Sequence, residues 1–404
     1  MKYIFSTGLP RSGTALMSKA LYASNQASIA VGPNVEIYRF FRNKIISKYG
    51  SSSLKKKIKK YSPIPDYFAC KEGEELLNLM LNSNLEERFD KKDWGSFLEK
   101  SQSKIDHDSS DLIKDFHKLK GKTFKDIILN LLRIIEKKRK LKIKKKKSQN
   151  TFYGFHETWN ICSLKSLAKS FPNAKFFIVI RDPRSVWASL SKNAEKRQEL
   201  RVHLLSFIRH FRKYIIFADY YLNLSLFKDR LMVIKYENLV TNPEQYLKKI
   251  CKFLNINFNK NMANPNKHYD FITKKTWVPF SSFGTKFQKL NTKPIHKWKK
   301  YLQDIEVKSI EFLCKKEMKS MGYQFKFSPE KIRFKQVMSF IRKNYNKKVN
   351  WRTDLKNFKE DNKIELFRYK ILQKKIFPNK LLLKKCFLFQ NFSLNNLTKH
   401  HQSQ

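Results

Sequence analysis

The sequence is poor in acidic residues, glycine and cysteine, and it lacks long apolar runs. Its 404 residues include 34 Asp and Glu against 85 Lys and Arg, with only 10 Gly and 5 Cys. No apolar run approaches the length that crosses a bilayer, so we expect no transmembrane segment. The first residues already have the character of a core strand, so we expect no signal peptide and a cytoplasmic location. One domain with additions is the simplest organisation for this length.

The cysteines and histidines show no spacing typical of a metal site. The five cysteines are scattered and have no C-x-x-C pair: Cys70, Cys162, Cys251, Cys314 and Cys386. Four histidines also lack ligand spacing: His203, His210, His268 and His296. We therefore expect reduced, mostly buried thiols, without a zinc site or a disulfide framework.

The net charge of +51 has two interpretations. One is specific binding to nucleic acid or to an anionic membrane surface. The other, which we favour, is a compositional bias toward Lys, Asn, Ile and Phe together with anionic substrates. It predicts only non-specific, salt-sensitive binding of nucleic acid, and it leaves a peripheral membrane contact open.

Residues 4–15, IFSTGLPRSGTA, combine an apolar run, a Gly-rich loop and the start of a helical segment. Such a strand, loop and helix N-terminus form a cradle for an anion. Gly8 and Gly13 have the spacing of an ATP-binding P-loop, but Thr14 stands where that motif has Lys. The cation is Arg11, inside the loop. This pattern disfavours an Mg-ATPase and favours a nucleotide whose leaving phosphate or sulfate is held by Arg.

Residues 171–191, FPNAKFFIVIRDPRSVWASLS, contain a second candidate phosphate site. The nearly all apolar run 175–180 predicts a buried parallel strand, with Arg181 at its end. Asp182 and Pro183 then suit the N-cap and first position of a helix. Ser189 falls about two turns along that helix. Arg181 and Ser189 are thus placed to grip one phosphate from two sides.

The two stretches, in this order, resemble the PAPS-dependent sulfotransferase superfamily, PAPS being 3′-phosphoadenosine 5′-phosphosulfate. The Arg-type loop is nearest to those of tyrosylprotein and bacterial carbohydrate sulfotransferases. Segments 231–254, 277–298 and 305–323 extend the resemblance, which covers roughly residues 1–50 and 150–325. It implies PAPS as the sulfo donor with no metal required. The implied donor-binding residues are Pro10, Arg11, Ser12, Gly13, Thr14, Ala15, Arg181, Ser189, Tyr236, Ser281, Ser282 and Lys293.

The chemistry of sulfuryl transfer suits these residue types. An acceptor oxygen attacks sulfur in line while charge builds on the bridging oxygen, as in phosphoryl transfer. The transferred group carries less charge than a phosphoryl group, so fixed donors and one cation can stabilise it. Arg11 suits that role because it stays charged and offers several donors. Tyr236 is either a nucleotide contact or ordinary core packing, and Trp187 is expected in the core.

Three residues are candidates for the catalytic acid or base. Glu36 follows the first helix, and the alternatives to a catalytic role are a solvated surface residue or a partner for Arg39. Glu157 activates or positions the acceptor, or it pairs with an Arg at a strand end. His156, where the family more often has Lys, contacts the sulfate or transfers a proton, or it is a packed core residue.

The expected fold is α/β, a P-loop-type parallel sheet flanked by helices, with a helical insertion and a basic C-terminal extension. Strands are expected near 152–156, 175–180 and 231–236. The sulfotransferase domain spans 1–325, with its core at 1–50 and 151–325 and a helical Lys-rich insertion at 51–150. The insertion includes an amphipathic helix at 124–135 and a solvated connector at 137–147. Residues 326–404 are a helical appendage or a partner-binding tail.

These observations predict an enzyme that moves the sulfuryl group of PAPS to an acceptor hydroxyl, of a carbohydrate or glycolipid in the first instance. A protein tyrosine is the second candidate acceptor. Two other classes stay open, an ATP-dependent P-loop kinase and a basic nucleic-acid-binding protein on an enzyme scaffold. The intact Arg11, Arg181 and Ser189 count against both.

Overall fold

The computed structural model describes residues 2–31, 35–57, 71–102, 112–140, 151–264, 267–270, 275–276, 293–349, 355 and 357–403. The chain forms two compact units, which we call the sheet unit and the helical unit. The sheet unit comprises Met1–Tyr49, Met80–Val179 and Leu226–Thr292. The helical unit comprises Gly50–Leu79, Ile180–Ser225 and Lys293–Gln404.

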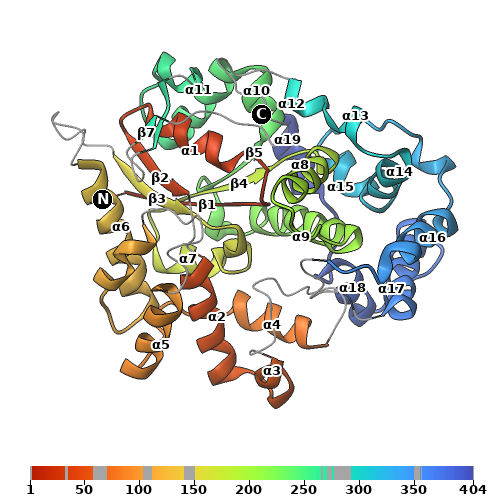
Figure 1. The fold of residues 1–404 in the computed structure, drawn as a ribbon, viewed down its shortest axis with the longest axis horizontal. Coiled ribbons are helices and arrows are strands. Elements are labelled where there is room, and N and C mark those ends of the chain that lie inside the picture. Colours follow the sequence, from red (N-terminus) through yellow and green to blue (C-terminus); the bar gives the residue numbers. More distant parts are fainter. Residues whose placement is uncertain are drawn as a thin grey trace. The chain divides into compact units, whose positions relative to one another are not determined.

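A five-stranded parallel sheet forms the centre of the sheet unit (Figure 1). Its strands are β1 (Lys2–Gly8), β2 (Ala27–Val31), β3 (Phe152–His156), β4 (Lys175–Ile180) and β5 (Leu231–Lys235). The spatial order is β2-β3-β1-β4-β5, so β1 lies in the middle. Parallel pairing sets Ser6 opposite His156 and Gly8 opposite Val179. This order puts the residues after β1 at a switch point of the sheet, where α/β proteins bind ligands.

The apolar sequences of these strands match their burial in the sheet. All of β3 and all of β4 after Lys175 are buried, as expected for parallel strands covered on both faces. The predicted α/β fold class is confirmed, and so are strands at 152–156 and 175–180, with the third ending at Lys235. The sequence analysis did not find β2, whose run ASIAV is short and made largely of small residues.

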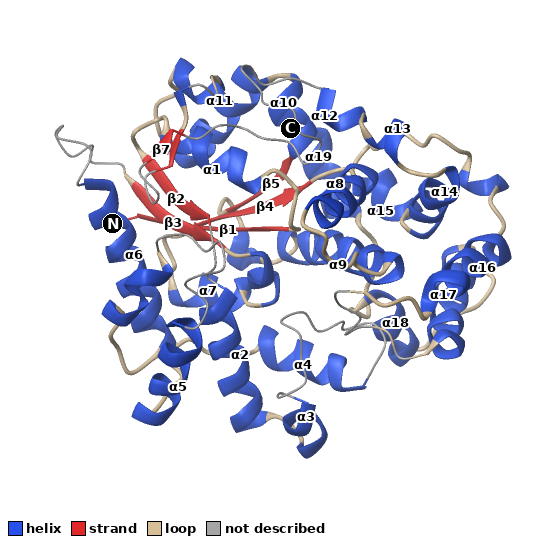
Figure 2. Cartoon of the chain, in the orientation of Figure 1, coloured by secondary structure: helices blue, strands red, loops and turns tan. Residues whose placement is uncertain are grey.

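Helices lie on both sides of the sheet (Figure 2). Among them, α1 contacts β1 and β2, whereas α6 contacts β2 and β3. The helices of this unit are α1 (Thr14–Tyr22), α2 (Val35–Tyr49), α5 (Lys91–Gln102), α6 (Phe124–Lys140), α7 (Leu164–Ser170), α10 (Tyr236–Thr241) and α11 (Pro243–Leu254). A short antiparallel pair, β6 (Tyr269–Asp270) with β7 (Lys275–Thr276), completes its regular structure as described.

The insertion follows the predicted pattern in part. Its amphipathic segment forms α6. The apolar residues of the predicted face are all buried: Phe124, Ile127, Ile128, Leu131, Leu132 and Ile135. The connector predicted to begin at Lys137 is wrong at its start, because α6 continues to Lys140. The remainder of that connector, 141–147, lies outside the described residues.

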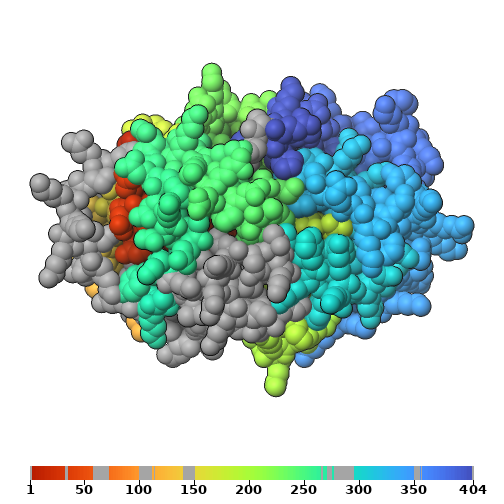
Figure 3. Space-filling view, turned by 90° about the horizontal axis from the view of Figure 1, so that it is seen from above, coloured from red at the N-terminus to blue at the C-terminus, as the bar shows by residue number. Residues whose placement is uncertain are grey.

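The helical unit is built almost entirely of α-helices. Residues from Lys293 onward lie side by side in the space-filling view, coloured cyan to dark blue (Figure 3). The helices are α3 (Ser52–Lys57), α4 (Lys71–Leu81, shared at its end with the sheet unit), α8 (Pro183–Lys196), α9 (Leu204–Leu222), α12 (Lys293–His296), α13 (Trp298–Tyr301), α14 (Asp304–Leu313), α15 (Lys315–Ser320), α16 (Phe334–Tyr345), α17 (Phe358–Leu372), α18 (Lys380–Phe387) and α19 (Asn395–Ser403).

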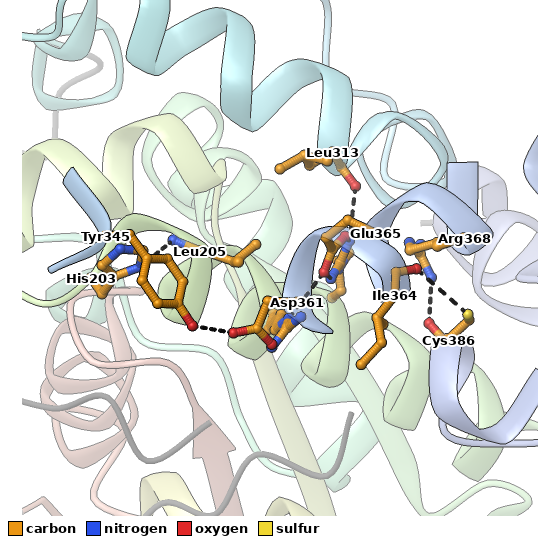
Figure 4. Close-up of polar contacts among 11 residues, drawn as sticks. His203, Leu205, Leu313, Tyr345, Asp361, Ile364, Glu365, Arg368 and Cys386 are labelled. Atoms are coloured by element: carbon orange, nitrogen blue, oxygen red, sulfur yellow. Dashed lines mark hydrogen bonds and ion pairs between the residues drawn. The ribbon is translucent and has the colours of Figure 1, made fainter. Parts of the chain in front are cut away.

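Helix α9 is the core of the helical unit, and it carries two buried arginines. Arg209 binds Asp361 at 2.9 Å through Nη1 and Glu365 at 3.0 Å through Nε. Arg212 binds both oxygens of Glu365, at 2.8 and 2.9 Å. Figure 4 shows Asp361 and Glu365 on α17. We call these four residues the arginine–carboxylate cluster. It joins α9 to a helix about 150 residues later, which shows that residues 357–372 pack within this unit.

Within this cluster, the positive and negative charges stabilise each other's ionised forms. Burial opposes ionisation of Glu365, but Arg212 and Arg209 outweigh burial and hold the pKa of Glu365 at about 2. Arg368, one turn further along α17, pairs with Glu317 of α15, and Tyr345 of α16 donates its hydroxyl to Asp361. Paired in this way, buried charges avoid most of the desolvation cost that an isolated charge would carry.

The helices that the structure describes include none with both the length and the apolarity needed to span a membrane. The four described cysteines are buried thiols.

Candidate active site

The loop between β1 and α1 has the backbone of an anion cradle. Arg11 and Gly13 both adopt left-handed conformations, with φ of 71° and 95°. Ser12 closes the loop: its N–H and its hydroxyl both donate to the Leu9 carbonyl, at 3.1 and 2.7 Å. Alternating left-handed residues turn successive N–H groups toward one side, which is how such loops bind anions.

Two glycines of the loop lie where no side chain fits. A Cβ on Gly13 would lie 2.1 Å from Cδ2 of Tyr236, and one on Gly8 would lie 2.7 Å from the Val179 carbonyl oxygen. Tyr236 begins α10 directly after β5 and is 8% exposed. The predicted donor-contacting tyrosine therefore packs against the loop between β1 and α1, residues 9–13, which we call the phosphate loop after its predicted role.

The start of α1 supplies further donors. The first helical hydrogen bond runs from Met17 N–H to the Gly13 carbonyl, at 3.2 Å. The N–H groups of Thr14, Ala15 and Leu16 therefore precede the intrahelical ladder and are available to an anion at the helix N-terminus. Arg11 is partly exposed within the same loop. Together these groups fit a phosphate or a phosphosulfate.

Glu157 lies at the strand end next to this loop. It follows β3, the parallel neighbour of β1, and its N–H donates to the Ser6 carbonyl at 3.0 Å. The Thr7 hydroxyl donates to the Thr158 carbonyl at 2.8 Å. These two hydrogen bonds hold the segment after β3 against the last residues of β1, directly before the phosphate loop. The structure thus brings together two stretches that the sequence separates by about 150 residues.

Burial changes the acidity of Glu157. Glu157 is only 5% exposed, and this burial raises the pKa of Glu157 to about 8. The Trp159 N–H, at 3.1 Å, and the charge of Arg39 act against the shift, whereas Glu36 adds to it. A carboxyl with a pKa near the working pH has the strength that proton abstraction from a hydroxyl requires.

Glu36 belongs to the same electrostatic neighbourhood. It is buried in the first turn of α2, and it pairs with Arg39 at 2.7 Å. Helix α2 contacts the 3₁₀ turn Thr158–Cys162 that follows Glu157. Of the two alternatives for Glu36, the pairing with Arg39 is present, whereas a solvated surface position is wrong because Glu36 is buried. A catalytic role for Glu36 stays a prediction.

His156 is a neutral, buried imidazole. Burial lowers its pKa to about 3, and Nδ1 lies 3.2 Å from the Ser6 hydroxyl. At neutral pH the ring therefore carries no positive charge toward a sulfate. The geometry favours Glu157 over His156 as the group that takes a proton.

The second phosphate element, in the helical unit, has the local structure expected from its sequence. Arg181 directly follows β4, and Asp182 caps α8 by accepting from the Arg184 N–H at 2.9 Å. Pro183 occupies the first helical position. Ser189 lies two turns along and is 5% exposed, whereas Arg181 is partly exposed.

A buried arginine braces this element, and the sequence analysis missed it. The Arg184 guanidinium binds Asp182 at 2.6 Å and also pairs with Glu311 of α14. Glu311 in turn accepts from the N–H groups of Lys326 and Phe327, at 2.8 and 2.9 Å. The position of Arg184, directly after a helix-capping Asp-Pro pair, was the available signal.

Other predicted residues have different outcomes. Trp187 is a core residue, as predicted: it is 4% exposed, and its indole N–H donates to Glu306 at 2.9 Å. Ser281 and Ser282 lie outside the described residues, as does the side chain of Lys293. Within the described ranges, no group of three or more His, Cys, Asp or Glu is arranged to hold a metal ion.

A model of the sulfotransferase family matches residues 4–260. The chain belongs to the sulfotransferase family, because this match covers more than half of its length. Over 134 residues, 32% of this chain, it is 31% identical to a protein-tyrosine sulfotransferase of Drosophila melanogaster. The aligned segment covers only 26% of that relative.

Two solved structures are also similar to this chain. One is the sulfotransferase domain of the olefin synthase from Synechococcus PCC 7002, with a TM-score of 0.42 and 18% identity, covering 75% of this chain and 89% of that one. The other is the sulfotransferase domain from the curacin biosynthetic pathway, with a TM-score of 0.44 and 16% identity, covering 80% and 98%.

Proposed function

We propose that the chain is a PAPS-dependent sulfotransferase in which Glu157 is the general base. The observation that carries this proposal is the placement of Glu157, with its raised pKa, on the strand next to the one that feeds the Arg11 loop. An anion-binding loop and a basic carboxylate at neighbouring strand ends provide what sulfuryl transfer to a hydroxyl needs.

The donor is proposed to be held through its two phosphate-bearing ends. Backbone N–H groups of residues 13–15 and the Thr14 hydroxyl hold the 5′-phosphosulfate, whereas the Ser12 N–H donates to the Leu9 carbonyl and keeps the loop closed. Arg181 and Ser189 hold the 3′-phosphate, as the family resemblance implies. Tyr236 supports the conformation of the loop, because its ring occupies the space beside Gly13.

PAPS supplies an activated sulfuryl group, and the residues of this chain govern its transfer. The acceptor oxygen forms a bond to sulfur as the bond from sulfur to the bridging oxygen breaks. Glu157 takes the acceptor proton, and Arg11 stabilises the charge that builds on the bridging oxygen. The products are a sulfate ester and adenosine 3′,5′-bisphosphate, so atoms and charge balance without a metal.

Two classes of acceptor are proposed. A carbohydrate or glycolipid hydroxyl is the first, because the insertion at 51–150 suits a sizeable acceptor. A protein tyrosine is the second, and the 31% identity to a protein-tyrosine sulfotransferase favours it. Labelled PAPS offered with a disaccharide, a glycolipid or a tyrosine peptide separates them, since the label moves to one class and not the other.

Calorimetry of nucleotide binding tests the function itself. We expect adenosine 3′,5′-bisphosphate to bind more tightly than AMP, and this preference to be lost in Arg181→Ala. Equal or tighter binding of Mg-ATP would overturn the proposal and favour the kinase alternative. A basic nucleic-acid-binding protein would instead bind RNA in a salt-sensitive way that Arg11→Ala and Arg181→Ala leave nearly unchanged.

A further inference from the structure

The connection between α17 and α18 holds a large apolar side chain out in solvent. Phe377 is 98% exposed, and Leu381, the second residue of α18, is 54% exposed. Burial of a side chain of this size stabilises a fold, so this exposure forgoes a sizeable stabilisation. We call residues 373–381 the α17–α18 tip.

The backbone fixes Phe377 in this position. Helix α17 ends in a left-handed residue, Lys374, with φ of 59°. The N–H groups of Lys374 and Lys375 close the helix end on the carbonyls of Ile371 and Lys370, both at 2.9 Å. Such a double closure is a common helix stop. The tip therefore begins at a defined turn.

The other side of the tip is equally defined. Asn379 caps α18 by accepting from the Leu382 N–H at 2.9 Å. Further along α18, Phe387 is fully buried, and Arg368 donates to the Cys386 carbonyl at 2.9 Å. Both ends of the tip are anchored in the helical unit, and Phe377 lies in the connection between them.

Positive charge surrounds the exposed apolar side chains. Three exposed lysines lie in the tip, namely Lys374, Lys375 and Lys380, and a fourth, Lys385, follows on α18. None of them forms an ion pair with a carboxylate of the described residues. Residues 366–404 contain eight Lys and Arg and no Asp or Glu. The tip thus lies in a stretch whose charge has one sign only.

We propose that the α17–α18 tip binds the surface of an anionic lipid bilayer. An apolar residue that enters the interface, flanked by lysines that attract anionic headgroups, is a two-part anchor of the kind that gives reversible membrane association. Nucleic acid fits less well, because its single strands are held by base stacking on aromatic rings, which Leu381 cannot provide. The inference is independent of the proposed sulfuryl transfer.

Sedimentation of the full chain with lipid vesicles tests this inference. We expect partition onto phosphatidylcholine vesicles that contain about one third phosphatidylserine, and little onto pure phosphatidylcholine. Phe377→Ser lowers the partition about tenfold through the lost apolar contact. Lys374→Ala combined with Lys375→Ala lowers it by a similar factor and weakens its dependence on salt.

Matched variants distinguish the tip from the general charge of the chain. Leu200→Ser removes another exposed apolar side chain, and Lys91→Ala with Lys92→Ala removes an exposed lysine pair in the sheet unit. Both leave the partition within about twofold of the parent. Equal loss in these controls, or binding that Phe377→Ser leaves unchanged, overturns the inference in favour of unspecific adsorption of a basic protein. Thermal unfolding confirms that each variant is folded.

Discussion

The phosphate loop and the arginine–carboxylate cluster use the same residue type in opposite ways. In the loop, Arg11 is partly exposed and lies on a left-handed backbone between two glycines that admit no side chain. In the cluster, Arg209 and Arg212 are fully buried, and carboxylates of the chain itself neutralise them.

The two regions differ in the partner that each positive charge meets, which is a ligand in the loop and a carboxylate of the chain in the cluster. A charge that must meet a ligand has to keep solvent access and rigid backbone donors around it. A charge in the core has to be matched within the fold, since an unmatched one costs several kcal/mol. Removal of the arginine charge in the loop should therefore change activity with little change in stability, and removal of a charge in the cluster should do the reverse.

The largest effect is expected from Arg11→Ala. Loss of a transition-state donor of this kind lowers the rate by about 10²–10³-fold. Transfer from labelled PAPS to the acceptor panel measures the rate, and thermal unfolding measures stability. We expect the melting temperature to stay within about 2 °C of the parent. Arg11→Lys, which keeps a charge but not the planar fork, recovers part of the rate. A fall in stability that matches the fall in rate would erase the contrast between the two regions.

Glu365→Ala is the counterpart in the cluster. It leaves Arg209 and Arg212 buried without their shared carboxylate, so the free energy of unfolding falls by about 3–5 kcal/mol. Urea denaturation measures the loss. Glu360→Ala, on the exposed side of the same helix, is the control and costs less than about 1 kcal/mol. If both variants lost equal stability, the cluster would not be what holds α17 to α9.

Gly13→Ala sharpens the contrast from within the loop. The new Cβ clashes with the Tyr236 ring, and an alanine must adopt the left-handed backbone conformation of Gly13. Together these effects lower the free energy of unfolding by about 1–3 kcal/mol and weaken donor binding. Calorimetry with adenosine 3′,5′-bisphosphate measures the binding. Gly95→Ala is the control, because a Cβ there has nothing within 4 Å, and in helix α5 it is expected to be neutral or stabilising. Addition of Tyr236→Ala to Gly13→Ala separates the clash from the backbone strain.

The smallest expected effect is a dependence of rate on pH. The pKa of Glu157 is about 8, so the ionised base declines about tenfold for each pH unit below that value. The rate therefore rises with a midpoint near pH 8 and levels off above about pH 9.

Two variants assign this rise to a residue. Glu157→Gln removes the rise and leaves a low, flat rate. Glu36→Gln keeps the rise but moves its midpoint to lower pH, because the charge of Glu36 helps to raise the pKa of Glu157. A rise that survives Glu157→Gln and disappears in Glu36→Gln would make Glu36 the base.

Local patterns allowed part of this structure to be predicted. The phosphate loop, the Asp182-Pro183 helix start and the amphipathic face of α6 each depend on neighbouring residues, and each is found where the sequence indicates. Helix α9 was missed because it is buried on nearly all sides, so that its Arg209 and Arg212 look like residues of a solvent face in the sequence.

The sequence by itself determined the family and the α/β sheet, and it predicted which residues hold a phosphate, because these features depend on short, contiguous motifs. Only the tertiary structure decided which charges are buried and which carboxyl has a raised pKa. Glu157 acquires its pKa from burial at a strand end beside β1, and Arg209 acquires its partner from a glutamate 156 residues later in the chain. Desolvation and ion pairing depend on which distant segments pack together, and no local pattern records that packing.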